Sequence, residues 1–132
     1  MPFTIINLSE AERQLLALFR NSRDPYDEQS VTLGYVNGTE VCLMGWPQRP
    51  SHRDPREVPP HKNQLDSMQI VLEGEMTLYY PDEDEVVTLK PGDCHVVPAG
   101  KMHSCVSSRK TRVLVIVGSR GQIHGLTGSG AR

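Results

Sequence analysis

The sequence has few aromatic residues, no long apolar run and no large excess of charge. Aromatic residues make up 5% of the 132 residues, which argues against a surface that stacks nucleobases. The formal net charge is -2, so no basic face for nucleic acid is expected. The longest apolar run, Val113 to Val117, is far shorter than the roughly 20 residues that span a bilayer. We therefore expect neither nucleic acid nor membrane as a partner.

Signals for disulfide pairing and for secretion are also missing. The three cysteines, Cys42, Cys94 and Cys105, are odd in number and show no C-x-x-C spacing. The first residues, MPFTIINLSE, lack the charged region and long apolar stretch of a secretory signal. These features predict a cytoplasmic protein whose cysteines stay reduced.

One helix is predicted, close to the N-terminus at residues 8–21. Ser9 and Glu12 match a capping-box pattern at its start. Apolar residues then follow at helical spacing at Ala11, Leu15 and Leu18. We expect this helix either to pack its apolar stripe on the rest of the chain or to form a dimerisation arm.

From residue 31 onward, short β-rich runs alternate with turns that contain glycine and proline. The predicted strands cover residues 31–36, 41–46, 67–73, 75–80, 86–89, 94–97, 103–107 and 112–117. Many short strands indicate an all-β sandwich or barrel. We predict a helical extension at 1–29, a β-barrel domain at 30–118 and a glycine-rich tail at 119–132 that is poorly ordered at its end.

A proline-rich stretch at residues 47–60 interrupts the predicted strands. Its five prolines lack the N–H groups that regular strand pairing needs, and the stretch also carries Arg49, His52, Arg53 and Arg56. One interpretation is a surface connection. The other is a lid that brings a cation over the mouth of a site.

Two segments of the predicted barrel carry the pattern that is most informative about function. GDCHVVPAGKMH has Gly92, Pro98, Gly100 and His103 at the spacing G-x5-P-x-G-x2-H. HKNQLDSMQIVLEGEM begins at His61 and ends with a turn at Gly74. Together they resemble the two motifs of the cupin superfamily. The resemblance implies a double-stranded β-helix, or jelly-roll barrel, with the site inside.

The first of these motifs departs from the pattern of the family. Its usual metal ligands are His-x-His and a following Glu, which fall here on His61, Asn63 and Ser67. His61 and His103 remain as good metal ligands, and Asn63 offers a weaker carbonyl oxygen. The remaining set is compatible with one divalent ion, such as zinc, iron, nickel or manganese, or with no tightly bound ion.

Strand periodicity predicts which side chains face the interior. Residues two apart share a face of a strand, so alternate residues of a strand through this motif are expected to point inward together. The predicted ligand-binding residues are His61, Asn63, Ser67, Gln69, His103 and Cys105. The opposite face, with Met68, Ile70 and Leu72, is apolar and requires a cover, which either the N-terminal helix or a second subunit would provide.

Three functional hypotheses follow. The first is a binding protein whose polar side chains orient a small molecule inside the barrel. The second is a metal-dependent oxygenase or isomerase, with Asp66 or Glu73 as the nearest candidate general base. The third is a homodimeric structural or regulatory protein without catalysis. Cys105 is a weaker candidate as a nucleophile that His103 activates.

Overall fold

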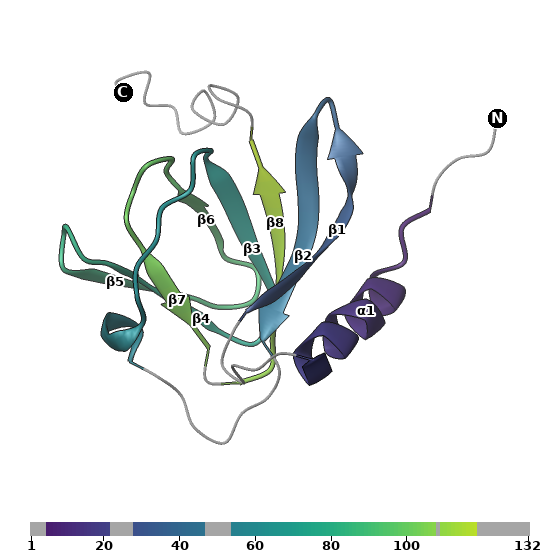
Figure 1. The fold of residues 1–132 in the computed structure, drawn as a ribbon, viewed down its shortest axis with the longest axis horizontal. Helices are drawn as coiled ribbons and strands as arrows, with labels where there is room; N and C mark the ends of the chain where they lie inside the picture. Colours follow the sequence, from purple (N-terminus) through teal and green to yellow (C-terminus); the bar gives the residue numbers. More distant parts are fainter. Residues whose placement is uncertain (1–4, 22–27, 47–53, 108, 119–132) are drawn as a thin grey trace.

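The computed structural model describes residues 5–21, 28–46, 54–107 and 109–118, and Figure 1 shows their arrangement. In these ranges the helix α1 spans Leu8–Asn21 and the short 3-10 helix η1 spans Pro55–Glu57. The strands are β1 (Gln29–Val36), β2 (Thr39–Trp46), β3 (Ser67–Glu73), β4 (Met76–Tyr80), β5 (Glu85–Leu89), β6 (Cys94–Val97), β7 (Ser104–Val106) and β8 (Thr111–Val117). Every predicted helix and strand is present, with ends within two residues of those expected.

The strands form two antiparallel sheets that face each other (Figure 1). The larger sheet has the order β1-β2-β8-β3-β6, and the smaller has the order β5-β4-β7. Alternate side chains of both sheets point inward, as strand periodicity requires, and pack into one apolar core. This core contains Cys42, Met44, Trp46, Val71, Met76, Leu78, Tyr80, Leu89, Val97, Val113 and Val115. The predicted all-β jelly-roll barrel is therefore confirmed.

Helix α1 packs on the outer face of β1 and β2. Its buried residues Ala11 and Leu15 contact Leu43, which is fully buried on the side of β2 opposite the main core. Figure 1 shows the helix lying beside β1 and β2. Met68 and Ile70 on the outer face of β3 are only half-buried, so this face is less completely covered than the core.

The start of α1 differs from the prediction. The Asn7 side chain, not that of Ser9, accepts a hydrogen bond from the backbone of Glu10 at 3.0 Å. Glu12, the other half of the predicted capping box, forms ion pairs with Lys110 at 2.9 Å and Arg112 at 3.4 Å. The N-cap is therefore Asn7, two residues before the predicted Ser9. Glu12 instead links the helix to the start of β8 through its ion pairs.

Two predicted segments fall wholly or partly outside the described residues. The tail at 119–132 lies outside them, as do Arg49, His52 and Arg53 of the proline-rich stretch. Arg56 is described, and its guanidinium lies over the ring of Tyr79, 5.1 Å from the centroid. Among the described residues, no helix has both the length and the apolar character needed to cross a membrane.

Candidate functional site

Two histidines from distant parts of the chain are paired through their backbones at one end of the barrel. His61 donates its N–H to the carbonyl of His103 at 2.9 Å, and His103 donates to the carbonyl of His61 at 2.8 Å. This short antiparallel bridge brings their rings to a centroid distance of 4.4 Å. The pairing joins the two motifs that the sequence singled out.

Further hydrogen bonds fix the segment that follows His61 against the second motif. The carbonyl of Asn63 accepts from the backbone of Gly100 at 2.8 Å. The buried carboxylate of Asp66 accepts from the backbone of Ala99 at 2.6 Å. Asp66 therefore positions the loop before His103, and its use as a general base in the site stays a prediction.

His103 is held in a defined tautomer. It is 2% exposed, and its Nδ1 lies 2.9 Å from the carbonyl oxygen of Lys101. Because a carbonyl oxygen only accepts hydrogen bonds, Nδ1 carries the proton. In the neutral ring, Nε2 is then left with a lone pair that is available to a ligand.

His61 has a more open position at the same end of the barrel. Partial burial lowers its pKa, and the neighbouring His103 lowers it further because two positive charges would repel each other. The His61 ring is therefore predominantly uncharged at neutral pH, so it too is able to accept a hydrogen bond or bind a ligand as a neutral imidazole.

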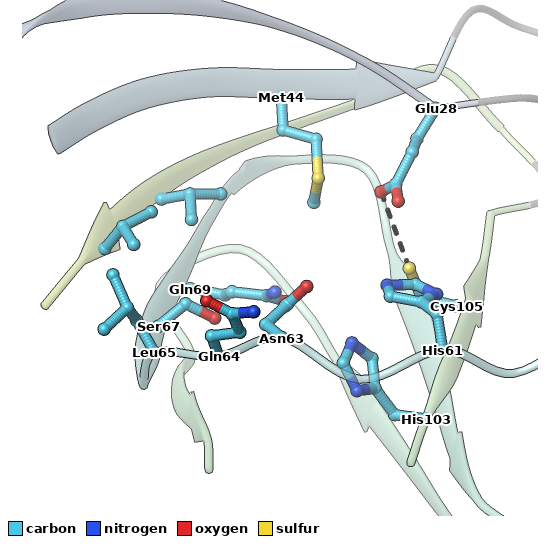
Figure 2. Close-up of a pocket in the computed structure, with 12 residues that line it drawn as sticks. Glu28, Met44, His61, Asn63, Gln64, Leu65, Ser67, Gln69, His103 and Cys105 are labelled. Carbon is cyan, nitrogen blue, oxygen red and sulfur yellow. Dashed lines mark hydrogen bonds between the residues drawn. The ribbon is translucent and has the colours of Figure 1, made fainter. Parts of the chain in front are cut away.

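A cavity of about 270 Å³ opens beside the two histidines (Figure 2). Apolar side chains of β2 and β8, among them Met44 and Val115, form part of its wall. The polar residues that line it are Glu28, His61, Asn63, Gln64, Ser67, Gln69, His103 and Cys105. All six residues that the sequence proposes for ligand binding thus lie around one space, and their role in binding remains a prediction.

Two of these residues have buried polar atoms that find no hydrogen-bond partner in the part of the chain that the structure describes. Ser67 and Gln69 are 4% and 5% exposed, and both belong to the inward face of β3. Within the described part of the chain, Ser67 Oγ and Gln69 Oε1 have no partner. A buried polar atom without a hydrogen bond destabilises a fold by about 1–3 kcal/mol. In Figure 2 both side chains extend among the residues that line the cavity.

Cys105 and Glu28 join the edges of the two sheets across this cavity. The thiol of Cys105, on β7, donates to a carboxylate oxygen of Glu28, just before β1, at 3.5 Å (Figure 2). Burial raises the pKa of the Cys105 thiol well above its usual value, and the negative charge of Glu28 raises it further. A thiol that stays protonated is a poor nucleophile, which disfavours the catalytic interpretation of Cys105.

Glu28 and Gln64 were not predicted as site residues. Glu28 was assigned to the N-terminal extension, and no local pattern distinguishes it from the other acidic residues of the chain. Gln64 falls between two positions predicted to face inward, but residues 62–66 are not in a strand, so strict alternation does not hold there. Both line the cavity because of how separate segments meet in space.

Glu73 does not face the cavity. The pairing of β3 with β8 shifts register between Val71 and Glu73, and such an irregularity changes the face to which later residues point. The Glu73 carboxylate lies 3.4 Å from Arg112 and 3.8 Å from Lys110. The prediction that Glu73 lies inward as a candidate base is therefore wrong.

His95 lies inside the barrel and forms a short hydrogen bond with Tyr80, with 2.6 Å between His95 Nε2 and the phenol oxygen. The ring of Tyr80 also lies 6.3 Å from that of His103. Burial raises the pKa of Tyr80 to about 12, so its phenol stays protonated. Burial likewise lowers the pKa of His95, and Glu85 only partly opposes this.

The lowered pKa of His95 predicts how stability changes with pH. The unfolded chain binds a proton at His95 near pH 6.5, while the folded protein does so only at lower pH. Keeping His95 neutral therefore costs the folded protein no stability above about pH 6.5, and the protein loses stability as the pH falls from there toward the lowered pKa of His95. Urea unfolding between about pH 7.5 and 5 should show falling stability, and His95→Gln should flatten that dependence. If the free energy of unfolding of His95→Gln changes with pH as steeply as that of the parent, His95 is not the source of this pH dependence.

The residues of the site do not fit a tightly bound metal ion. The described residues contain no group of three or more His, Cys, Asp or Glu that could hold one. Beside the two imidazoles, the first motif supplies an amide at Asn63 and a hydroxyl at Ser67, which are weak, neutral donors. A divalent ion would lose its hydration without gaining a carboxylate from this motif.

Comparisons with known proteins agree with this architecture. The family model for the cupin domain matches residues 49–117, which is just over half of the chain. The protein therefore belongs to the cupin family. No protein of the curated set matches this sequence.

Several solved structures share the fold. A protein of unknown function from Rhizobium leguminosarum bv. viciae aligns with a TM-score of 0.62 at 17% identity, over 89% of this chain and 97% of that chain. A cupin-2 domain protein from Shewanella frigidimarina gives 0.58 at 18%, over 85% and 92%. A cupin superfamily protein from Desulfitobacterium hafniense gives 0.55 at 22%, over 69% and 76%. At these identities the similarity shows the fold and does not identify a ligand.

Proposed function

We propose that this cupin binds a compact polar organic molecule in the cavity beside His61 and His103, through hydrogen bonds and without a tightly held metal. The observation that carries the proposal is the pair of buried atoms at Ser67 and Gln69 that have no hydrogen-bond partner among the described residues. Hydrophobic residues at these two positions would extend the apolar core, so the polar groups need another reason to be there. A bound molecule that satisfies them provides one.

The size and lining of the cavity support a small ligand. Its volume of about 270 Å³ is slightly below the range typical of sites for drug-sized molecules. Apolar wall residues next to a few convergent polar groups are the usual composition of a site that orients a metabolite. We therefore expect the protein to act as a binding module, and none of the described site residues is assigned a catalytic role.

Extraction of the purified protein tests this proposal. We expect denaturation of the untagged protein to release a small organic molecule that mass spectrometry detects. The molecule should be absent from a Ser67→Ala/Gln69→Leu variant. A Glu57→Gln variant, altered at an exposed residue of η1, provides the matched control and should retain the molecule. Equal amounts from the parent and the cavity variant would contradict binding in this cavity.

The metalloenzyme hypothesis makes the opposite prediction about metal content. His103 favours it in one respect, since its fixed tautomer leaves Nε2 free in the manner of a metal ligand. Because the first motif supplies no carboxylate beside the two imidazoles, we expect untagged protein to contain well below one equivalent of zinc, iron, nickel or manganese. A His61→Ala/His103→Ala variant should contain a similar amount. Near-stoichiometric metal that disappears in this variant would overturn the metal-free proposal and justify assays for an oxygenase or isomerase.

We also propose that the protein forms a homodimer through the outer face of β3 and its neighbours. On this face Ile70 pairs with Leu114, and Met68 pairs with both Ile116 and Val96 across the sheet. These side chains are half-buried and apolar, which suits a contact with a second copy.

A charge placed on this face should separate the subunits. We expect Ile70→Lys to convert a dimer to a monomer in sedimentation or light-scattering measurements, because a buried ammonium without a partner is strongly unfavourable in an apolar interface. Thr88→Lys, at an exposed position of β5, should leave the mass unchanged. An Ile70→Lys variant of unchanged dimeric mass would show that this face is not the interface.

The unpaired state of all three cysteines suits a reducing compartment. Cys42 and Cys105 are not available on the surface, since the first is buried and the second contacts Glu28 inside the barrel. We propose a cytoplasmic location on this basis, which fractionation of cells that produce the protein would test.

A further inference from the structure

We infer that the ligand of this cavity is a small carboxamide with a short aliphatic skeleton, and this inference rests on the proposed function. A carboxamide carries a hydrogen-bond donor and an acceptor on neighbouring atoms. The polar residues of β3 that line the cavity call for both kinds of partner, and the apolar residues of the lining suit an aliphatic group. These two features select the ligand through hydrogen bonding and shape.

Gln69 supplies the strongest constraint on the ligand. Its side chain is 5% exposed and lines the cavity, and its Oε1 has no hydrogen-bond partner among the described residues. The side chain ends in one accepting oxygen and one donating nitrogen, and a half-turn about its last bond exchanges the two atoms. A partner that both donates and accepts therefore satisfies Gln69 in either orientation. A carboxamide does so with two parallel hydrogen bonds.

The neighbouring polar groups of the lining have the same dual character. Ser67 lies two residues before Gln69 on the inward face of β3, and its hydroxyl, which donates or accepts, also has no partner in the described part of the chain. Asn63 and Gln64 add two more side-chain amides, and Figure 2 shows them on the same side of the cavity as Gln69. A ligand that only accepts, such as a ketone, would leave the oxygen of Gln69 unsatisfied.

The apolar part of the lining accommodates a short branched carbon skeleton. Met44 of β2 and Val115 and Val117 of β8 line the cavity together with Leu65. These side chains favour contact with an alkyl group over contact with a chain of hydroxyls, because they offer no hydrogen-bonding group of their own to replace lost water. The volume of about 270 Å³ suits a compact molecule.

Three uncharged probes of similar branched shape test the inference. Isobutyramide donates and accepts on neighbouring atoms, methyl isopropyl ketone only accepts, and methyl isopropyl carbinol has a single hydroxyl. We would titrate each into the full-length protein and follow the NMR signals of the Met44 methyl group and the Gln69 side-chain amide. We expect isobutyramide to bind about tenfold more tightly than the ketone, because the ketone leaves a buried acceptor unsatisfied. The carbinol should bind with intermediate affinity.

A single substitution isolates the contribution of the Gln69 amide. Gln69→Met keeps the length of the side chain and removes its donor and acceptor. It should lower the affinity for isobutyramide about tenfold and bring it within about twofold of that for the ketone. Glu57→Gln, at an exposed residue of η1 outside the cavity, should leave the order of the three affinities unchanged. If Gln69→Met fails to fold, the order of affinities in the parent protein still decides the question.

The outcomes also separate this inference from the proposed function. If the ketone or the carbinol binds as tightly as isobutyramide and shifts the cavity signals, the carboxamide class is wrong and the cavity is still a binding site. If none of the three probes shifts these signals, the carboxamide class is also wrong, and the extraction experiment decides the proposed function independently. An advantage of isobutyramide that persists in Gln69→Met would contradict the inference, and one that disappears there would support it.

Discussion

Replacement of Gln69 by leucine is expected to make the protein more stable and to abolish ligand binding. The substitution removes a buried amide oxygen that has no partner among the described residues, and it extends the apolar face formed with Val71. We expect the free energy of unfolding in urea to rise by about 1–3 kcal/mol, the usual penalty of an unsatisfied buried group. The same change removes an acceptor from the cavity, so a molecule held by the parent protein should be lost.

Gln64→Leu is the matched control for this prediction. Gln64 lines the same cavity but is exposed, so the substitution should leave the free energy of unfolding within about 0.5 kcal/mol of that of the parent. A gain in Gln64→Leu equal to that in Gln69→Leu would point to a general effect of apolar substitution. A loss of stability in Gln69→Leu would show that the Gln69 amide is satisfied in the free protein, and the principal support for the binding proposal would be removed.

A second large effect is expected at Gly74, where the chain turns between β3 and β4. Its φ of +85° lies in the left-handed region that residues with a side chain rarely adopt. A Cβ atom at this position would also lie far inside contact distance of the Thr111 hydroxyl and the Lys110 carbonyl. The Thr111 hydroxyl accepts from the backbone of Glu75 at 3.1 Å, so displacing it would also disturb the turn. We expect Gly74→Ala to lower the free energy of unfolding by about 3–5 kcal/mol.

Gly100→Ala separates the two causes of this loss. Gly100 has a similar φ of +77°, but a Cβ atom there would meet nothing within 4 Å among the described residues. The free energy of unfolding of this variant should fall by only about 1 kcal/mol, the cost of placing a residue with a side chain in the left-handed backbone region. Chemical denaturation of both variants measures the difference. If the two losses are equal, close packing against Thr111 does not explain why glycine is needed at residue 74.

Local patterns in the sequence predict the strands and one half of the site. His103 lies in a motif without gaps, and its glycine and proline residues define the loop that precedes it. Asn63 and Ser67 could be located by counting back from Gly74. These predictions depend on spacing within one segment, which the fold preserves because neighbouring residues on a strand alternate between its two faces.

Competition between similar patterns accounts for the error at the helix start. Both Asn7 with Glu10 and Ser9 with Glu12 match a cap followed three residues later by glutamate. The choice between them depends on Lys110 and Arg112, which lie about a hundred residues away and attract Glu12. No examination of the helix sequence alone reveals these two partners.

The sequence by itself determined the order of the strands along the chain, the family to which it belongs and the position of His103 in the barrel. The tertiary structure alone decided that Glu28 meets Cys105, because this contact depends on β1 and β7 being the edge strands of two facing sheets. It also decided that Glu73 points away from the cavity, because a register shift against β8 interrupts the alternation of β3. Alternation is a local property of one strand, whereas the meeting of sheet edges and the shift in pairing depend on segments far apart in the chain.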